Sequence, residues 1–401
     1  MQKNAQAITT AALLLGAAGS GVTRADEPAK VAAEPAKPAT PSIFDVLDAS
    51  GIAISGYVDA SYERLSGLGL FSSLTPDRVF DARHESFTLN QAAITIAKQP
   101  KEGFGAVVNL TAGQDAEVIK SYPNTGGSDF DVTQAFVQYA TGPLTVIGGK
   151  FVTLAGAEVI NPTTDSNFSR SILFGYAIPF THTGLRGTYA LGDQVSMTLG
   201  VNNGWDQVSD ANKQKTVEFG LTLTPIKVFT FVIDGYVGKE PLAIVNNVPT
   251  AAAGQRFLID AVATWNVNDK FTIMANYDNG QQKDDTFGAT KDTYKWNGAA
   301  IYFNCQITDQ WSASLRAEYF DDDDGYRTGV VDPLSGKGQT WKEATVTFAY
   351  APTKHFLLRI EGRYDKSNIQ GAFIKSMASA MGSPDVTDNQ NSVAFEGIYK
   401  F

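Results

Sequence analysis

Few residues in this sequence have the type and spacing that catalysis or metal binding requires. A covalent hydrolase needs a nucleophile oriented by a histidine, and the nearest approach is His182, which two threonines flank. The acidic run "DDDDG" at 321–325 offers carboxylates for a divalent cation, but it lacks the alternating ligands and fixed glycine position of a calcium loop. We therefore expect His84, His182 and His355 to be surface or interface residues, and the acidic run to be a solvated patch.

The remaining chemistry of the chain also argues against an enzyme. No CxxC, HExxH, GxSxG, P-loop or dinucleotide-binding motif occurs in a usable context, so no metal and no cofactor is expected. The formal net charge of −10 argues against nucleic acid as a partner. Cys305 is the only cysteine, which excludes a disulfide within one chain.

The first 25 residues have the organisation of an export signal. Lys3 precedes an apolar segment at 7–22, and Ala25 supplies a small residue at the expected cleavage point. The alternative is a membrane-anchoring helix, but the apolar run is interrupted and falls short of the ~20 residues that span a bilayer. Residues 26–50 are rich in Pro and Ala, and we interpret them as a periplasmic leader.

Alternating apolar and polar residues predict β-strands through the rest of the chain. In "GIAISGYVDASY" (51–62), even-numbered positions are mainly apolar and odd-numbered ones mainly polar. We count sixteen such segments. They lie at 51–62, 86–97, 103–113, 130–140, 143–152, 181–191, 195–205, 216–225, 228–238, 256–267, 270–280, 294–305, 311–321, 340–350, 355–366 and the C-terminus.

The connections between these segments alternate in length. Short, turn-rich connections such as "TGP", "NDK" and "APTK" separate much longer ones. Bacterial outer-membrane barrels have an even strand number, short periplasmic turns and long external loops. The sequence therefore predicts an all-β fold, a transmembrane antiparallel β-barrel of sixteen strands over 51–401. A soluble exported β-protein is the rival fold.

The two faces of the predicted strands differ in chemistry. One face carries aromatic residues near strand ends, which suits the aromatic girdles of a membrane barrel. The other face is polar and includes Asp59, Glu218, Asp260, Glu318 and Glu361. A sixteen-stranded barrel is wide enough to hold water, so this polar face is expected to line an aqueous channel.

The C-terminal strand has an aromatic outer face. Phe395, Tyr399 and Phe401 share one side of "SVAFEGIYKF", and the strand is expected to close the barrel by pairing with 51–62. An ending of this kind resembles the signal that the outer-membrane assembly machinery recognises. We therefore interpret these three residues as an assembly signal.

The longest connection, 152–184, exceeds what a turn needs and is expected to be functional. It lies within "GGKFVTLAGAEVINPTTDSNFSRSILFGYAIPFTHTGLR", which, with the aromatic C-terminus, resembles the OmpL-like β-barrel porin family of bacterial outer membranes. The resemblance covers roughly 50–401. It implies an outer-membrane channel for small hydrophilic solutes and ions, and a homotrimer.

The resemblance also implies a role for charged residues of this third loop. General porins fold the third loop into the barrel, with acidic groups against arginines on the wall. By resemblance, Glu158 and Asp165 face some of the wall arginines, and Arg170 braces the loop; the wall arginines are Arg186, Arg316, Arg359 and Arg363. The alternative is that Glu158 and Arg170 only hold the loop by local pairing. The apolar segment at 171–180 either packs the loop inside the barrel or extends a strand into lipid.

Two functions remain open from the sequence. The first is a passive outer-membrane porin whose third loop narrows the pore. The alternative is a non-conducting barrel with an adhesion or structural role through its external loops. In either case the expected surroundings are outer-membrane lipid and lipopolysaccharide, the latter contacting the acidic run at 321–325 through divalent cations.

Overall fold

The computed structural model describes residues 47, 49–65, 68–69, 78–123, 129–245, 248–250, 253–286, 292–376 and 385–401. The predicted signal peptide and nearly all of the predicted leader lie outside these residues. The chain divides into two units, Met1–Ser50 and Gly51–Phe401. All strands belong to the second unit.

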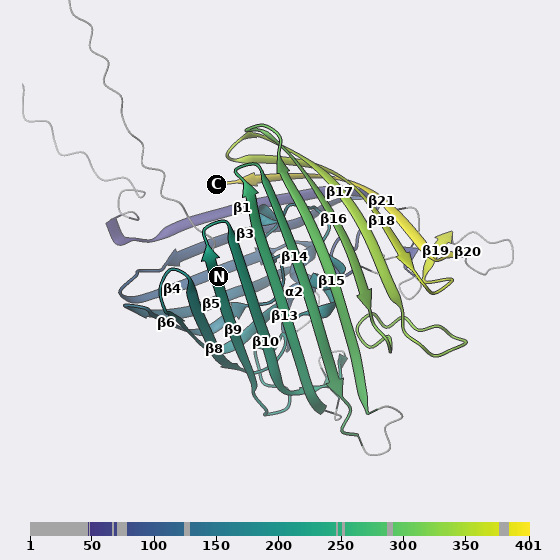
Figure 1. Cartoon of the computed structure of the whole chain (residues 1–401), viewed down its shortest axis with the longest axis horizontal. Coiled ribbons are helices and arrows are strands. Elements are labelled where there is room, and N and C mark those ends of the chain that lie inside the picture. Colours follow the sequence, from purple (N-terminus) through teal and green to yellow (C-terminus); the bar gives the residue numbers. More distant parts are fainter. Residues whose placement is uncertain are drawn as a thin grey trace, which may run out of the picture. The chain divides into compact units, whose positions relative to one another are not determined.

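Sixteen antiparallel strands form a closed barrel, as the sequence predicts (Figure 1). Its strands are β1 (Ala53–Leu65), β3 (Phe87–Lys98), β4 (Gly103–Ala112), β5 (Phe130–Thr141), β6 (Leu144–Val152), β7 (Thr181–Ala190), β8 (Val195–Asn202), β9 (Thr216–Ile226), β10 (Phe229–Pro241), β13 (Ala253–Asn268), β14 (Phe271–Lys283), β15 (Thr293–Gln306), β16 (Trp311–Asp321), β17 (Thr340–Thr353), β18 (Phe356–Ser367) and β21 (Asn389–Lys400). Each strand pairs with its sequence neighbour in the barrel, and β1 pairs with β21 to close it.

The seam between β1 and β21 ends at the last residue of the chain. Gly56 and Phe401 exchange two backbone hydrogen bonds of 3.0 Å. A Cβ on Gly56 would lie 2.4 Å from the Phe401 ring, so the absence of a side chain at Gly56 makes room for that ring. The predicted pairing of the C-terminal strand with 51–62 is therefore confirmed.

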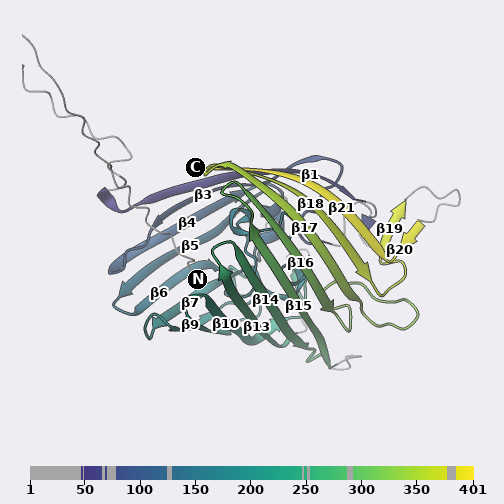
Figure 2. The same ribbon diagram turned by 45° about the horizontal axis from the view of Figure 1, so that its top comes forward.

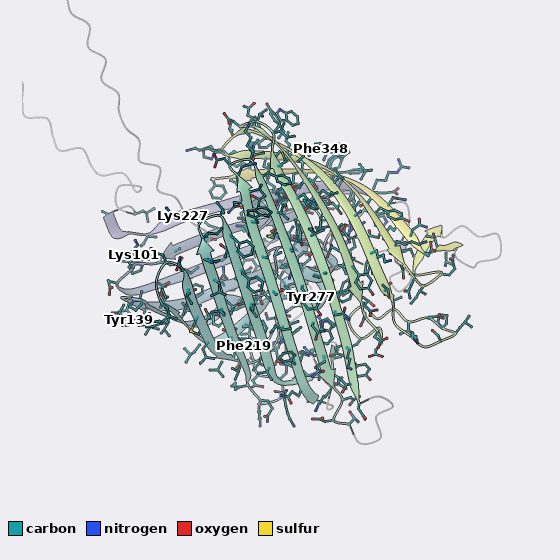
Figure 3. The ribbon with its side chains drawn as sticks, in the orientation of Figure 1. Lys101, Tyr139, Phe219, Lys227, Tyr277 and Phe348 are labelled. Atoms are coloured by element: carbon teal, nitrogen blue, oxygen red, sulfur yellow. The ribbon has the colours of Figure 1, made fainter. Side chains whose placement is uncertain are left out.

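Side chains alternate between an apolar outer face and a polar inner face. Tyr139, Tyr277 and Phe348 on the wall are 42%, 47% and 49% exposed (Figure 3). Five of the polar residues predicted to face inward, Asp59, Glu218, Asp260, Glu318 and Glu361, are buried.

The connections differ at the two ends of the barrel. Short turns such as 142–143 and 269–270 lie at one end, and long connections lie at the other. Two of the long connections meet in a small sheet of β2 (Leu68–Gly69), β19 (Phe373–Ser376) and β20 (Asp385–Thr387), and Figure 2 shows β19 and β20 beyond the ends of β18 and β21. A second small sheet pairs β11 (Ile244–Val245) with β12 (Val248–Pro249).

Within Gly51–Phe401, the helical segments among the described residues are short and belong to long connections. They are α2 (Gln114–Ile119), the 3-10 helix η1 (Pro162–Thr164) and the π-helix η2 (Leu173–Ala177). Among the described residues, no helix is both long and apolar enough to cross a membrane.

Three sequence predictions need correction. The third loop spans 153–180, because Val152 ends β6 and Thr181–Gly184 already pair in β7. His182 is 0% exposed and stacks on Tyr236, so it is neither a surface nor an interface residue. Asp322 of the acidic run is also buried, where it accepts hydrogen bonds from the backbone of Arg327 and Thr328, so the run is not wholly solvated.

Candidate functional site

The third loop leaves β6 and enters the barrel interior. Thr153 Oγ1 lies 2.9 Å from Tyr236 Oη, and the Leu154 amide donates to the same hydroxyl at 2.8 Å. Further on, the Ala157 amide donates to Asn276 Oδ1 at 3.3 Å. Because Tyr236 and Asn276 face inward from β10 and β14, the first part of the loop runs along the inner wall on that side.

Glu158 contacts both the wall and its own loop. Arg316 Nη1, from β16, donates to Glu158 Oε1 at 2.7 Å, while Glu158 Oε2 accepts from the Ser171 amide at 2.6 Å. Arg316 also lies 2.8 Å from Glu343 and 3.2 Å from Glu318. The fully buried guanidinium thus meets three carboxylates, and Glu158 links the wall to the backbone of its own loop.

Asp165 and Arg170 form a pair within the loop, at 3.2 Å. Arg170 also donates to the carbonyls of Val159, Ile160 and Phe168 of the same loop. Burial raises the pKa of Asp165 to about 7, although the nearby charge of Arg170 opposes this shift.

Arg359 and Arg363 hold the same loop from β18. Arg359 Nη2 donates to the carbonyls of Pro162 and, at a short distance, Asp165, and its Nη1 pairs with Glu396 at 2.8 Å. Arg363 Nη1 donates to the Arg170 carbonyl at 2.7 Å. These two arginines therefore bind backbone oxygens of the loop and do not pair with its carboxylates.

Arg186 lies at the start of the third loop and contacts neither Glu158 nor Asp165. Its guanidinium donates twice to Glu218, at 2.6 and 3.0 Å, and it stacks over the Phe151 ring. A further bond of 3.1 Å to the Val152 carbonyl supports the point where the loop leaves β6.

Two glutamates of the wall bind backbone amides of the loop. The sequence placed both on the inner face but gave them no role. Glu361 accepts from Phe168 N and Ser169 N at 2.7 and 3.0 Å. Glu318 accepts from Ile172 N and Leu173 N at 3.0 and 3.2 Å. The alternation of apolar and polar residues predicted that these glutamates face inward. No feature of the sequence predicts which backbone amides they bind.

The first loop contributes an arginine that the sequence did not single out. Arg78 lies 2.8 Å from Glu63, 2.7 Å from Asp81 and 2.7 Å from Asp365, and it is buried. Beside it, Phe80 contacts the rings of Phe174 and Phe180 in the third loop. The first and third loops therefore pack together inside the barrel.

The apolar segment at 171–180 packs inside the barrel, which decides between the two alternatives left open by the sequence. Leu173, Phe174 and Ile178 belong to a buried cluster that includes inward-facing rings of the wall. One of these, Trp296 of β15, donates its Nε1 proton to the Ala177 carbonyl at 3.0 Å. The π-helix is thereby fixed against β15.

The wall on the other side of the loop carries an unpaired acidic row. Asp234, Asp260 and Asp278 are directly opposite one another on β10, β13 and β14, and all three are buried. Asn276 donates to Asp260 Oδ2 at 2.6 Å, but none of the three forms a salt bridge with any described residue. The described part of the chain also contains no group of three or more His, Cys, Asp or Glu residues placed to hold a metal ion.

The lumen nearer the short turns is lined by uncharged hydroxyl groups. Thr188 and Thr198 lie 2.9 Å apart, Thr224 and Thr230 lie 3.4 Å apart, and all four are partly exposed. A side chain of this kind hydrogen-bonds to water without adding charge. The charged groups are thus concentrated around the third loop.

Comparisons with known proteins agree with this architecture. The family model described as "Putative beta-barrel porin-2, OmpL-like" matches residues 51–401. No curated protein sequence matches the chain.

Solved structures with the same fold are outer-membrane proteins. The outer membrane channel DcaP of Acinetobacter baumannii has a TM-score of 0.58 at 12% identity, covering 87% of this chain and 97% of that one. An anion-selective porin from Comamonas acidovorans has a TM-score of 0.57 at 11% identity, covering 87% and 99%. The trimer form of OmpT from Vibrio cholerae has a TM-score of 0.57 at 10% identity, with the same coverage of 87% and 99%.

Proposed function

Because the chain belongs to the OmpL-like family of β-barrel porins, we propose that its third loop forms the constriction of an outer-membrane diffusion channel. The chain is an outer-membrane porin for passive diffusion. The loop, with Glu158, Asp165 and Arg170, is the part that sets the width of the path. Arg186, Arg316, Arg359 and Arg363 are the wall residues that support it.

The observation that carries this proposal is the path of the loop across the barrel. The loop leaves β6 and reaches Arg316 on β16, eight strands away around the sixteen-stranded barrel. It also contacts Tyr236 and Asn276 on β10 and β14, and Arg359 and Glu361 on β18. A segment attached at both sides of a wide barrel reduces the cross-section that is open to solutes. Small hydrophilic solutes and ions are the class that such a water-filled path admits.

The test is conductance in a planar bilayer. The purified protein is expected to give stepwise current increases, and the reversal potential in a salt gradient then reports its ion preference. Silence at all voltages and salts, from protein whose unheated form migrates as a folded barrel on a gel, would contradict the channel and favour an adhesion or structural role.

We also propose that Phe395, Tyr399 and Phe401 form the assembly signal. They are 54%, 50% and 55% exposed on the outer face of the last strand, and Phe401 completes the seam with Gly56. Phe401→Ala is expected to lower the amount of folded protein in the outer membrane, with the conductance of each assembled channel retained. Phe348→Ala, which removes an equally exposed ring elsewhere, is the control. Normal membrane levels of the Phe401 variant would overturn this role.

We also propose how the chain is exported and which partners it meets in the outer membrane. Signal cleavage after Ala25 is tested by N-terminal sequencing of protein isolated from the outer membrane. A homotrimer is supported by the trimer form of OmpT, and crosslinking in intact membranes tests it: a dominant band at three times the monomer mass is expected, and only monomer would contradict it. The assembly machinery, the surrounding lipid and lipopolysaccharide are the further partners we propose.

A further inference from the structure

A polar pocket of about 180 Å³ lies among the long connections, away from the constriction contacts. Its apolar side is formed by Pro241, Leu242 and Ile244, at the end of β10 and in the connection that follows. Its polar side is formed by Trp205, Gln207, Glu240, Arg256, Tyr326 and Arg327. The pocket therefore lies at the long-loop end, which is the external end of a porin.

Arg256 enters the pocket from the inner face of β13. Its Nε donates to Gln282 at 2.6 Å, and its Nη2 donates to the Pro241 carbonyl at 3.0 Å and to the Tyr326 hydroxyl at 2.8 Å. All of these partners are neutral. The guanidinium is thus held in place without a counter-charge in contact with it.

Arg327 meets Arg256 across an indole ring. Arg256 lies over the Trp205 ring at 4.8 Å, and Arg327 lies over the same ring at 5.4 Å and over Trp296 at 5.3 Å. The Nε of Arg327 donates to the Tyr176 carbonyl. Burial, followed by the like charge of Arg256, lowers the pKa of the Arg327 guanidinium.

Neither arginine has a carboxylate within 4.0 Å among the described residues. The nearby acids are engaged elsewhere. Glu240 accepts from Trp205 N, Thr216 Oγ1 and Gln207 Nε2, at 3.2, 2.5 and 2.9 Å. Asp322 accepts from the backbone amides of Arg327 and Thr328.

From these contacts we propose that the pocket binds a small organic carboxylate. Two guanidinium groups whose neighbours are neutral can donate to the same carboxylate group, and hydrogen bonds between two charged groups are the strong ones. The exposed lining of the pocket is mainly polar even beside Pro241, Leu242 and Ile244, so the body of the carboxylate is small and polar, as in a short hydroxy acid. The volume of the pocket is below that of sites for drug-sized ligands, which run from about 300 Å³.

This site is separate from the constriction and goes beyond the proposed diffusion function. A carboxylate bound there occupies the external vestibule before it meets the third loop. Because Arg327 also holds the Tyr176 carbonyl, the occupied pocket contacts the end of the third loop through one side chain.

The experiment is ligand-observed NMR on the full-length protein, folded in detergent, with lactate as the probe. Lactamide has nearly the same shape without the charge, and inorganic phosphate is an anion without a carboxylate group. We expect saturable binding of lactate and little binding of lactamide. Equal binding of lactate and lactamide, or binding of phosphate alone, would overturn the proposal.

Variants locate the binding. The double substitution Arg256→Gln and Arg327→Gln is expected to weaken lactate binding about ten- to a hundredfold, as the loss of charged hydrogen bonds implies. Arg64→Gln, which removes an exposed arginine, should bind as the unmodified protein does. If the double variant does not fold, Arg327→Gln alone is used. Unchanged binding in folded arginine variants would refute the site, and since no conductance enters the readout, this failure is distinct from failure of the channel.

Discussion

The arginines around the third loop and those of the pocket at the long-loop end are held in opposite ways. Arg316 meets Glu158, Glu318 and Glu343, all within 3.2 Å. Arg256 and Arg327, in that pocket, have neutral hydrogen-bond partners and the ring of Trp205. Arg316 and Arg256 are buried and Arg327 is half-buried, and both Arg316 and Arg327 contact the third loop.

The difference shows what each group can do. A buried guanidinium that contacts several carboxylates already has strong hydrogen-bond acceptors. It therefore holds together the segments that carry those carboxylates. A guanidinium held by carbonyls and aromatic rings keeps its position and still attracts an anion. The first arrangement suits a loop that must stay in the lumen, and the second suits a site that a solute enters and leaves.

The largest effect is expected from Arg316→Gln. It leaves three carboxylates without their shared counter-charge, and breaking a buried ion pair costs about 3 kcal/mol or more. We expect the temperature at which the folded barrel loses its anomalous gel migration to fall. The variant's channel should also be wider or noisier, because the bond to Glu158 is lost.

A matched variant separates charge from packing in that experiment. Combining Arg316→Gln with Glu318→Gln removes a carboxylate whose only salt bridge among the described residues is with Arg316, and should restore part of the thermal stability. If the single and double variants are equally stable, the carboxylates around Arg316 do not act as its counter-charges, and the contrast between the two groups fails.

A smaller effect is expected from Arg327→Gln. No carboxylate is left uncompensated, and the loss is one hydrogen bond to a carbonyl and two contacts with indole rings. The expected cost is about 1 kcal/mol, again measured by heat-dependent gel migration. A loss of stability as large as that of Arg316→Gln would show that the pocket has a bracing role like that of the loop.

The pH should act on the loop through Asp165. Its pKa is raised to about 7 by burial, so the folded state favours the protonated carboxyl and the barrel loses stability as the pH rises from about 4 toward 7. Below pH 7 the loop loses one negative charge, and the reversal potential in a salt gradient should shift toward anions. Asp165→Asn should remove this part of the pH dependence; an unchanged pH profile would contradict it.

The smallest effect is expected at an exposed ion pair. Arg64 and Glu85 are 4.0 Å apart, with side chains that are 77% and 61% exposed. Arg64→Gln should cost less than about 1 kcal/mol, as is usual for surface pairs. A larger loss of thermal stability would mean that burial is not what separates the arginines of this barrel.

The strands and their faces could be predicted from the sequence because each depends on local alternation. All sixteen predicted segments form barrel strands, and Asp59, Asp260 and Glu361 face inward as the period-two pattern requires. The loop given as 152–184 overlapped the strand predicted at 181–191. The structure decides for the strand, because Thr181–Gly184 pair with the end of β6.

The contacts of the third loop could be predicted only in part. The resemblance to a porin family named Glu158 and Arg316, which lie far apart in sequence and meet because the loop crosses the barrel. Arg78, Arg256 and Arg327 gave no signal, because each reaches its partners through loops or strands that no local pattern brings together. Their roles depend on the closed barrel.

The central claim is that the third loop narrows the channel, and single-channel conductance of a loop deletion tests it most directly. Deletion of residues 157–175 removes the loop contacts with Arg316, Glu361 and Arg359, while deletion of 332–337 shortens an exposed connection as the control. Larger current steps from the first deletion than from the unmodified protein, with unchanged steps from the second, are the predicted result. Equal steps from all three folded proteins would contradict the claim.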